Sequence, residues 1–317
     1  GEWREGLFPV PASPQKRKLW ICDRKISGNH GTGEEKYREK KMKISVLMEN
    51  TASSEKYLCR HGLSFYIETR KHKILFDMGP DGDFLQNAEK MNIDLSQVDI
   101  AFLSHGHYDH GGGLKAFLEV NQKAKIHMQK GVFENYFAHD TNPERIRYIG
   151  LDKSLKGNQR LVLHDGDYRI DEELEVFAGV TGRICASPAN DSLFVESEGQ
   201  QILDSFQHEQ NLLIHQDGKN ALICGCSHNG MVNILNRAEQ IIGKSADWAV
   251  GGLHLKGMYE EDPGSAELFF KKLADCLMEK PCVYYTCHCT GRAAYEYMKE
   301  KMGEQIHYLA SGDVAVL

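Results

Sequence analysis

The sequence predicts an α/β fold, with one domain over residues 42–317 and helices on both sides of its sheets. From Met42 onward, short apolar runs that are typical of strands alternate with helical patterns. The early part of this region is rich in strand patterns, and the later part repeats strand, helix and strand. No internal repeat of short period and no low-complexity tract interrupts the alternation. The 41% hydrophobic and 26% charged residues are ordinary for a chain that buries a core.

The first strand pattern begins where the character of the sequence changes, at Met42. Strand patterns fall at 43–48, 62–68, 73–77, 99–103, 125–128, 161–163, 174–178, 210–215, 219–224, 247–251, 282–286 and 306–309. Helical patterns fall at 83–91, 111–120, 131–138, 230–242, 264–279 and 291–302. Several histidines directly follow these strands, at the ends where α/β proteins place ligands.

Residues 1–41 differ from the rest of the chain. They mix prolines, glycines and a dense charge run with no sustained apolar period. Such a stretch cannot bury enough surface to offset the entropy lost on ordering it. We therefore expect a disordered or non-native leader before a natural first residue at Met42. The alternative is a targeting or partner-binding arm, but the segment lacks the Arg-rich, acid-poor character of a transit peptide.

Charge and cysteine content exclude several classes of protein. The 45 acidic and 38 basic residues give a formal net charge of −7, which argues against a nucleic-acid partner. No apolar run approaches the roughly 20 residues needed to span a bilayer. Nine cysteines are too sparse for a disulfide scaffold, and no secretory signal precedes them. We therefore expect a cytoplasmic protein with reduced thiols. Its expected partner is a small-molecule substrate and not a membrane, and the sequence leaves open whether the chain forms a homo-oligomer.

The most informative segment is a buried strand pattern followed by three histidines and an aspartate. His105, His107, Asp109 and His110 lie within six positions, and the glycines 111–113 then lead into a helix. Two imidazoles spaced two apart on an extended turn point the same way, while the next two side chains can reach a second point close by. Imidazole and carboxylate together suit zinc, iron or manganese. Side chains of this kind at a strand end serve no packing purpose.

This His-x-His-x-Asp-His pattern after an apolar strand resembles the metallo-β-lactamase superfamily, as does the run 74–79, which ends in Asp-x-Gly. The order of five segments, the cluster among them, resembles one branch, the archaeal 7,8-dihydropterin-6-methyl-4-(β-D-ribofuranosyl)aminobenzene 5'-phosphate synthases and their bacterial relatives. The segments are 61–64, 104–113, 225–230, 251–255 and 288–291. The resemblance implies a four-layer αββα sandwich, in which two mixed sheets carry helices on both outer faces.

The resemblance also implies further metal ligands downstream, and here the sequence departs from the usual pattern. Cys226 stands where the superfamily has a bridging aspartate, and a thiolate can also ligate zinc or iron. His228, two residues on, is our candidate for the next ligand, against the alternative of a helix-capping histidine. The usual Gly-His-Thr motif is absent, and either His208 or Glu209 could substitute for it.

Two histidines compete for the place of the last ligand. His288 follows the strand pattern 282–286 and is our preference, while His254 follows 247–251 and is assigned to catalysis, in contact with metal or substrate. A rival interpretation joins Cys224-x-Cys226 and Cys287-x-Cys289 in a four-thiolate zinc site. The spacing differs from the usual Cys-x₂-Cys, so this site requires the two strands to be neighbours.

These residues predict one or two divalent metal ions, with zinc ahead of manganese and iron. A metal would act as a Lewis acid; with only one bound, Asp109 would be free to serve as a general base. Thr290 and Arg292, at the start of a helix, and His61 are the expected substrate-binding residues, since a helix N-terminus favours anions.

We therefore expect a metal-dependent enzyme that acts on a phosphorylated or otherwise anionic small molecule, such as a synthase-like transferase. A general hydrolase (phosphodiesterase, lactonase or thioesterase) is the alternative, although the missing bridging aspartate counts against it. An iron-binding redox or sensing module is a third hypothesis.

Overall fold

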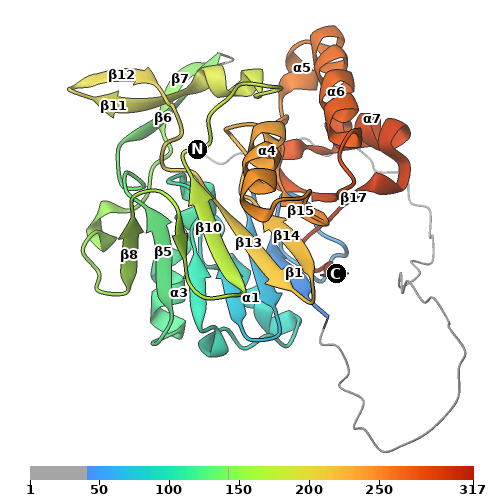
Figure 1. Cartoon of the computed structure of the whole chain (residues 1–317). Coiled ribbons are helices and arrows are strands. Elements are labelled where there is room, and N and C mark those ends of the chain that lie inside the picture. Colours follow the sequence, from blue (N-terminus) through green and yellow to red (C-terminus); the bar gives the residue numbers. More distant parts are fainter. Residues whose placement is uncertain (1–40, 142) are drawn as a thin grey trace, which may run out of the picture. The chain divides into compact units, whose positions relative to one another are not determined.

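The computed structural model describes residues 41–141 and 143–317. The expected leader, 1–41, lies outside the described residues except for Lys41. Two seven-stranded sheets face each other and carry helices on their outer sides (Figure 1). No helix in the described part of the chain is long and apolar enough to cross a membrane.

The first sheet is built from the N-terminal half of the described chain and closed at one edge by the last strand. Its order is β18-β1-β2-β3-β4-β5-β8. Strands β3, β4, β5 and β8 run parallel to one another, and the other neighbouring pairs are antiparallel. The strands are β1 Lys43–Met48, β2 Ser64–Glu68, β3 Lys73–Phe76, β4 Ile100–Phe102, β5 Lys125–Gln129, β8 Leu161–His164 and β18 Val314–Val316.

The second sheet has the order β17-β16-β15-β14-β13-β10-β9. Its strands β14, β15, β16 and β17 are parallel, and the rest are antiparallel. The strands are β9 Tyr168–Arg169, β10 Leu174–Ala178, β13 Gln210–Gln216, β14 Lys219–Ile223, β15 Trp248–Gly251, β16 Val283–Thr286 and β17 Ile306–Tyr308.

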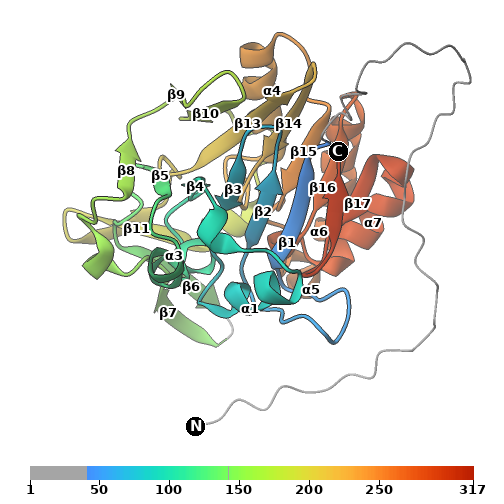
Figure 2. The ribbon, with the colours of Figure 1, turned by 90° about the horizontal axis from the view of Figure 1, so that it is seen from below.

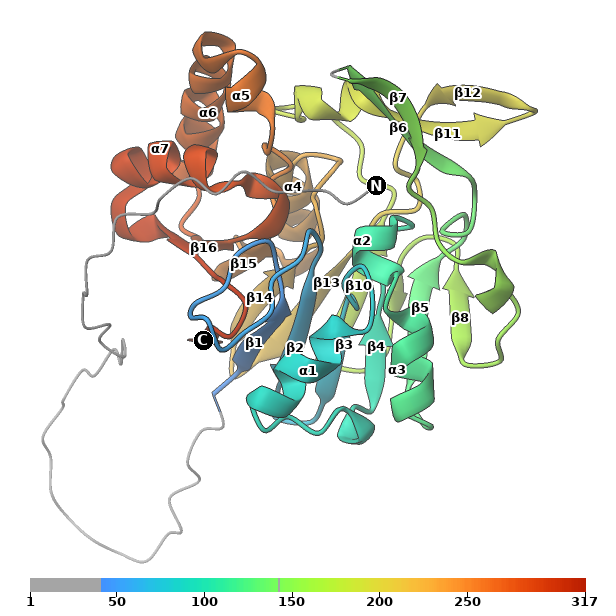
Figure 3. The same ribbon diagram turned by 180° about the vertical axis from the view of Figure 1, so that it is seen from behind.

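Helices complete the four layers. On the first sheet lie α1 Asp83–Lys90, the short α2 Tyr108–Gly111 and α3 Leu114–Val120; on the second lie α4 Met231–Ile242, α5 Met258–Glu261, α6 Pro263–Met278 and α7 Arg292–Met302. Figure 3 shows α1 and α3 in front of the first sheet, and Figure 2 shows them and α4 on opposite sides of the strands.

The buried side chains confirm the sandwich. One apolar cluster joins the inner faces of the two sheets, with Phe65 and Phe102 from one and Leu212 and Ile223 from the other. A second cluster lies between the second sheet and its helices, and a third between the first sheet and α1 and α3. Each sheet therefore buries both faces, as the αββα prediction requires.

The strand predictions each correspond to a strand of the two large sheets, but the predicted helix at 131–138 is wrong. The chain turns there, with Gly131 at φ +86°, and then enters β6 Tyr136–Thr141. Tyr136 and Ala138 are buried while Phe137 and His139 are half-buried, which is the period of a strand. β6 belongs to a third sheet of order β12-β11-β6-β7, with β7 Glu144–Tyr148, β11 Leu193–Ser197 and β12 Gln200–Leu203, which the sequence reading missed.

Candidate metal centre

The histidine cluster follows β4, with His105 and His107 on the loop before α2 and Asp109 and His110 within α2. His105 and His107 are both buried, and their rings are 4.6 Å apart. Gly106 separates them because a Cβ there would meet Val132 O at 2.5 Å, so the loop can lie this close to the next segment only with glycine. The sequence pattern thus brings two imidazoles to one end of the first sheet, as predicted.

The second sheet brings His228 to the same point. Its ring centroid lies 4.9 Å from that of His105 and 5.1 Å from that of His107. The Nε2 atoms of all three histidines are buried and have no hydrogen-bond partner. Buried polar atoms are nearly always satisfied, so three unpaired ring nitrogens that converge indicate a place for a cation.

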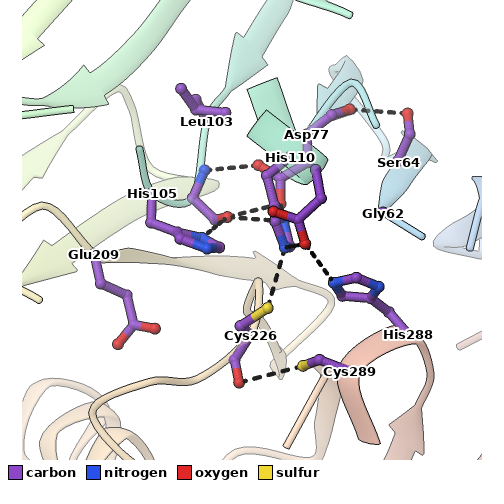
Figure 4. A network of polar contacts seen from close by, with 12 residues as sticks. Gly62, Ser64, Asp77, Leu103, His105, His110, Glu209, Cys226, His288 and Cys289 are labelled. Carbon is purple, nitrogen blue, oxygen red and sulfur yellow. Dashed lines mark hydrogen bonds and ion pairs between the residues drawn. The ribbon is translucent and has the colours of Figure 1, made fainter. Parts of the chain in front are cut away.

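A second group of ligands lies beside the first. One atom each of Asp109, His110, Cys226 and His288 lies within 4.8 Å of the others. His110 Nε2 is 3.1 Å from Cys226 Sγ (Figure 4). His288 Nε2 is 3.2 Å from Asp109 Oδ2. Cys226 also groups with His105 and His228, so its thiol lies between the two sets, where the sequence reading placed a bridging ligand.

Four of these histidines share one arrangement, in which Nδ1 has a partner and Nε2 faces the cluster. His105 Nδ1 lies 2.8 Å from Ser104 Oγ, and His110 Nδ1 lies 2.6 Å from Asp77 Oδ2. His228 Nδ1 lies 2.9 Å from Asn190 Oδ1, and His288 Nδ1 lies 2.7 Å from Asn50 Oδ1. Such contacts orient an imidazole and leave Nε2 for a metal. The described structure therefore fits the divalent ions that the sequence predicts.

Burial and neighbouring charges shift the pKa values of His107 and His110 in opposite directions. Burial, together with the nearby His208, lowers the pKa of His107 to about 3, so the ring is neutral and can ligate a metal. Burial also opposes a charge on His110, but the carboxylates of Asp77 and Asp109 outweigh it and raise its pKa to about 9. In a metal-free chain His110 is thus a cation, and a bound ion would take the place of its Nε2 proton.

The alternatives His208 and Glu209 are both occupied within the protein. His208 Nδ1 accepts a hydrogen bond from the Gly106 N–H at 2.9 Å, and its Nε2 donates to Asp204 Oδ2 at 2.9 Å. The Glu209 carboxylate accepts from the backbone N–H groups of His228 and Asn229 at 2.6 and 3.0 Å. Glu209 thus positions the segment that carries His228, while His208 also lies with His107 and Asp204 in a group that could hold a metal ion.

The ligand groups open into a cavity of about 1430 Å³. His61 and His254 line this cavity, and His61 Nε2 lies 3.4 Å from Asp109 Oδ2. Lys256 also lines it, with Nζ 3.5 Å from His61 Nδ1. The sequence reading missed Lys256, which follows His254 in the chain by two positions.

Thr290 and Arg292 are not among the described residues that line the cavity. The Thr290 hydroxyl accepts a hydrogen bond from the Leu253 N–H at 2.9 Å. The Arg292 guanidinium lies over the Tyr308 ring, 4.5 Å from its centroid. Both side chains thus contact other parts of the protein and not the cavity.

The four thiols of the rival zinc site do not converge. Cys224 is buried between the second sheet and its helices, and Cys287 lies in the cluster between the two sheets. Cys226 and Cys289, two residues further along each segment, line the cavity instead. Both pairs lie beyond the last residues of β14 and β16, where the chain leaves the extended conformation, so the two thiols of a pair do not share a face and only one of each reaches the cavity.

A family model described as the metallo-β-lactamase superfamily matches residues 58–202. The 7,8-dihydropterin-6-methyl-4-(β-D-ribofuranosyl)-aminobenzene-5'-phosphate synthase of Methanocaldococcus jannaschii is 30% identical over 289 residues, which are 86% of this chain and 96% of the synthase. MJ0448 of the same organism is 28% identical over 255 residues, 78% of this chain and 90% of its own.

Among solved structures, Tm1679 is described as a metal-dependent hydrolase of the β-lactamase superfamily. It superposes with a TM-score of 0.70 at 25% sequence identity, covering 87% of this chain and 99% of its own. Zinc-bound PqqB from Methylobacterium extorquens has a TM-score of 0.52 at 13% identity, covering 87% and 100%, and this likeness concerns the fold alone.

Proposed function

The chain belongs to the metallo-β-lactamase superfamily, and we propose that it is a metal-dependent enzyme acting on a phosphorylated or otherwise anionic small molecule. One observation carries the proposal. Three buried histidine nitrogens without hydrogen-bond partners lie beside a four-residue ligand group that includes Cys226, at a cavity large enough for a substrate.

Two adjacent ions, zinc ahead of manganese and iron, fit these groups. His105, His107 and His228 would hold one, and Asp109, His110 and His288 the other, with the Cys226 thiolate between them. When bound, such ions act as Lewis acids that polarise a phosphoryl or carbonyl oxygen and favour ionisation of water.

The chain supplies a cationic partner for the substrate beside these ligands. Lys256 Nζ and Asn50 Nδ2 lie 3.5 and 3.3 Å from His61 Nδ1, and both are donors. His61 therefore accepts at Nδ1 and carries its proton on Nε2, which faces Asp109. A phosphate or carboxylate bound beside Lys256 would meet an ammonium group, which favours an anion.

A transfer reaction on a phosphorylated compound is the proposal's specific form. Its support is the likeness to a synthase whose name includes a 5'-phosphate, together with a thiol where the superfamily pattern has a carboxylate. A hydrolase is the second candidate, favoured by the likeness to Tm1679. Asp109 lines the cavity, and with only one ion bound its carboxylate would be free to accept a proton in either reaction.

The test is an activity screen of the full chain with added zinc, manganese or iron(II). Chromogenic phosphodiesters and lactones probe hydrolysis, and release of diphosphate from pterin diphosphates probes transfer. We expect activity that His105→Ala/His107→Ala abolishes and that a control, His307→Ala, retains, because the His307 ring stacks on Tyr285 in the outer part of the second sheet. Unchanged activity and metal content in the double variant would refute the proposal.

A further inference from the structure

We propose a third metal position in this cavity, formed by Cys226, His254 and Cys289. It would hold a zinc-class cation through two thiolates and one imidazole, beside the two ions of the proposed function. It shares Cys226 with that function, but the other two ligands lie outside both of its groups.

The three side chains have the separation that a single ion requires. One ligand atom of each lies within 4.8 Å of the other two. Zinc binds sulfur at about 2.3 Å and imidazole nitrogen at about 2.0 Å, so ligand atoms on one tetrahedral ion lie about 3.5–3.8 Å apart. Side-chain shifts of about 1 Å or less bring this group to that spacing. Cys226, His254 and Cys289 come from the ends of three neighbouring strands, β14, β15 and β16, and therefore meet at one sheet edge.

The Cys289 thiol is held in place by its surroundings. A Cβ on Gly252 would lie 2.3 Å from Cys289 Sγ, so the sulfur packs directly against a position that admits only glycine. The backbone N–H of His254 donates to Cys289 Sγ at 3.2 Å, which favours a thiolate there. The Cys289 carbonyl in turn accepts from the N–H groups of Leu255 and Lys256 at 2.8 and 2.7 Å. These bonds tie the loop after β15 to the turn after β16.

The surroundings of His254 are a second, independent observation that points to a bound cation. Both of its ring nitrogens are buried and have no hydrogen-bond partner in the described structure. Its backbone has φ +52°, a left-handed conformation that costs a residue with a Cβ about 1 kcal/mol or more. Strain of this kind persists where the surrounding structure requires a particular side-chain direction. Here it brings the imidazole to the thiols and within 4.3 Å, between ring centroids, of His228.

The ligand types define the cation. Two thiolates and an imidazole form a soft, borderline set that suits zinc and disfavours magnesium or calcium. Three protein ligands leave a fourth position free, as in catalytic zinc sites, and all three residues line the cavity. A substrate donor could reach the ion from the cavity side. The third position thus extends the metal cluster away from His110 and Asp109, toward the loop of Lys256.

The experiment titrates the full chain with Co(II), after removal of metal by a chelator and with the thiols kept reduced. Sulfur-to-cobalt charge-transfer absorption reports thiolate ligation without any assay of activity. We expect wild type to bind about one Co(II) per chain more than Cys289→Ser or His254→Ala. Cys289→Ser should also lose about half of the charge-transfer absorption, since one of two thiolates is removed.

Cys287→Ser is the matched control. It removes a thiol two positions away that lies in the core between the sheets, so Co(II) binding should equal that of wild type. Far-ultraviolet circular dichroism and melting curves identify any variant that fails to fold, and His254→Ala, which retains both thiols, then decides alone. Equal Co(II) binding in wild type, Cys289→Ser and His254→Ala would overturn the third position and leave the proposed function intact. No Co(II) binding by wild type would overturn both.

Discussion

Asp77 Oδ2 lies 2.6 Å from His110 Nδ1, and neither side chain is exposed to solvent. The same carboxylate accepts from the Ser104 N–H and hydroxyl, both at 2.7 Å. Asp77 comes from the end of β3, while Ser104 and His110 flank the histidine cluster after β4. One buried carboxylate therefore fixes both ends of the metal-binding loop and directs His110 Nε2 toward Cys226.

Asp77→Ala should weaken metal binding by about 10–100-fold, because His110 and the Ser104 N–H lose their acceptor and the ligand loop is no longer oriented. Competition with a chromophoric chelator measures the affinity. Ser64→Ala is the matched control, since the Ser64 hydroxyl donates to the Asp77 carbonyl at 2.8 Å and does not touch the carboxylate. Equal affinities for Asp77→Ala and Ser64→Ala would show that the carboxylate does not support the site.

His228→Ala should lower the metal content by about one equivalent per chain, because it removes one of three ligands of the first ion. Elemental analysis of protein purified without chelator gives the content. Asn190→Ala keeps the ring and removes only its partner at Nδ1, so a smaller loss is expected. Wild-type metal content in His228→Ala would assign that ion to other residues.

Glu209→Ala should destabilise the fold by about 3 kcal/mol, since it leaves the N–H groups of His228 and Asn229 buried without an acceptor. Burial raises the pKa of Glu209, although the hydrogen bonds from Asn229 and His228 oppose this. Glu209→Gln retains one acceptor oxygen and should cost less. Urea unfolding measures both, and a Glu209→Ala protein as stable as wild type would contradict the assigned role.

Gly112→Ala should destabilise the chain by about 2–3 kcal/mol or more, because the added Cβ would lie 2.0 Å from Pro80 O and 2.6 Å from Tyr108 O. Both contacts are with backbone atoms, which cannot move aside as a flexible side chain can. Gly264→Ala, near the start of α6, is the control: its Cβ would meet only Asp262 Oδ1, at 3.6 Å. Its effect should stay within about 1 kcal/mol. Thermal melts that rank the two variants equally would refute the steric argument.

His72→Gln should cost more stability in acid than in alkali. His72 Nδ1 and Nε2 lie 3.1 and 2.7 Å from carboxylates of Asp99 and Asp171, and only the imidazolium can donate to both. Burial opposes the charge, but these carboxylates outweigh it and raise the pKa of His72 above 6.5. The stabilisation is therefore complete below the unfolded-state pKa and is lost as pH rises through the folded-state pKa.

In acid, the free energy of unfolding of His72→Gln should be about 1 kcal/mol below that of wild type, because solvent screens these partly exposed side chains. Urea unfolding at about pH 5 and about pH 9 measures it at the two limits. A difference that stayed constant with pH, or grew with rising pH, would contradict the assignment.

The local parts of the fold were predictable because short-range patterns encode them. Apolar runs and turn residues located the strands of both large sheets except the short edge strands β9 and β18, and the spacing from His105 to His110 identified the cluster before any contact was known. The strand β6 was missed because 131–138 has a mixed pattern, and its pairing with β7 and β11 comes from segments on both sides of it. Pairing of this kind is a tertiary effect that overrides local preference.

The sequence patterns by themselves determined an α/β class and the first four metal-binding candidates, while the resemblance to the superfamily implied the αββα layers and the unusual cysteine at 226. Only the tertiary structure decided among the distant candidates. It gave His208 and Glu209 hydrogen-bond partners within the protein, placed Thr290 and Arg292 away from the cavity, and brought Cys289 beside Cys226. The reason is physical: periodicity fixes which face of an element a side chain occupies, but which atoms meet depends on how β14, β15 and β16 align at one sheet edge.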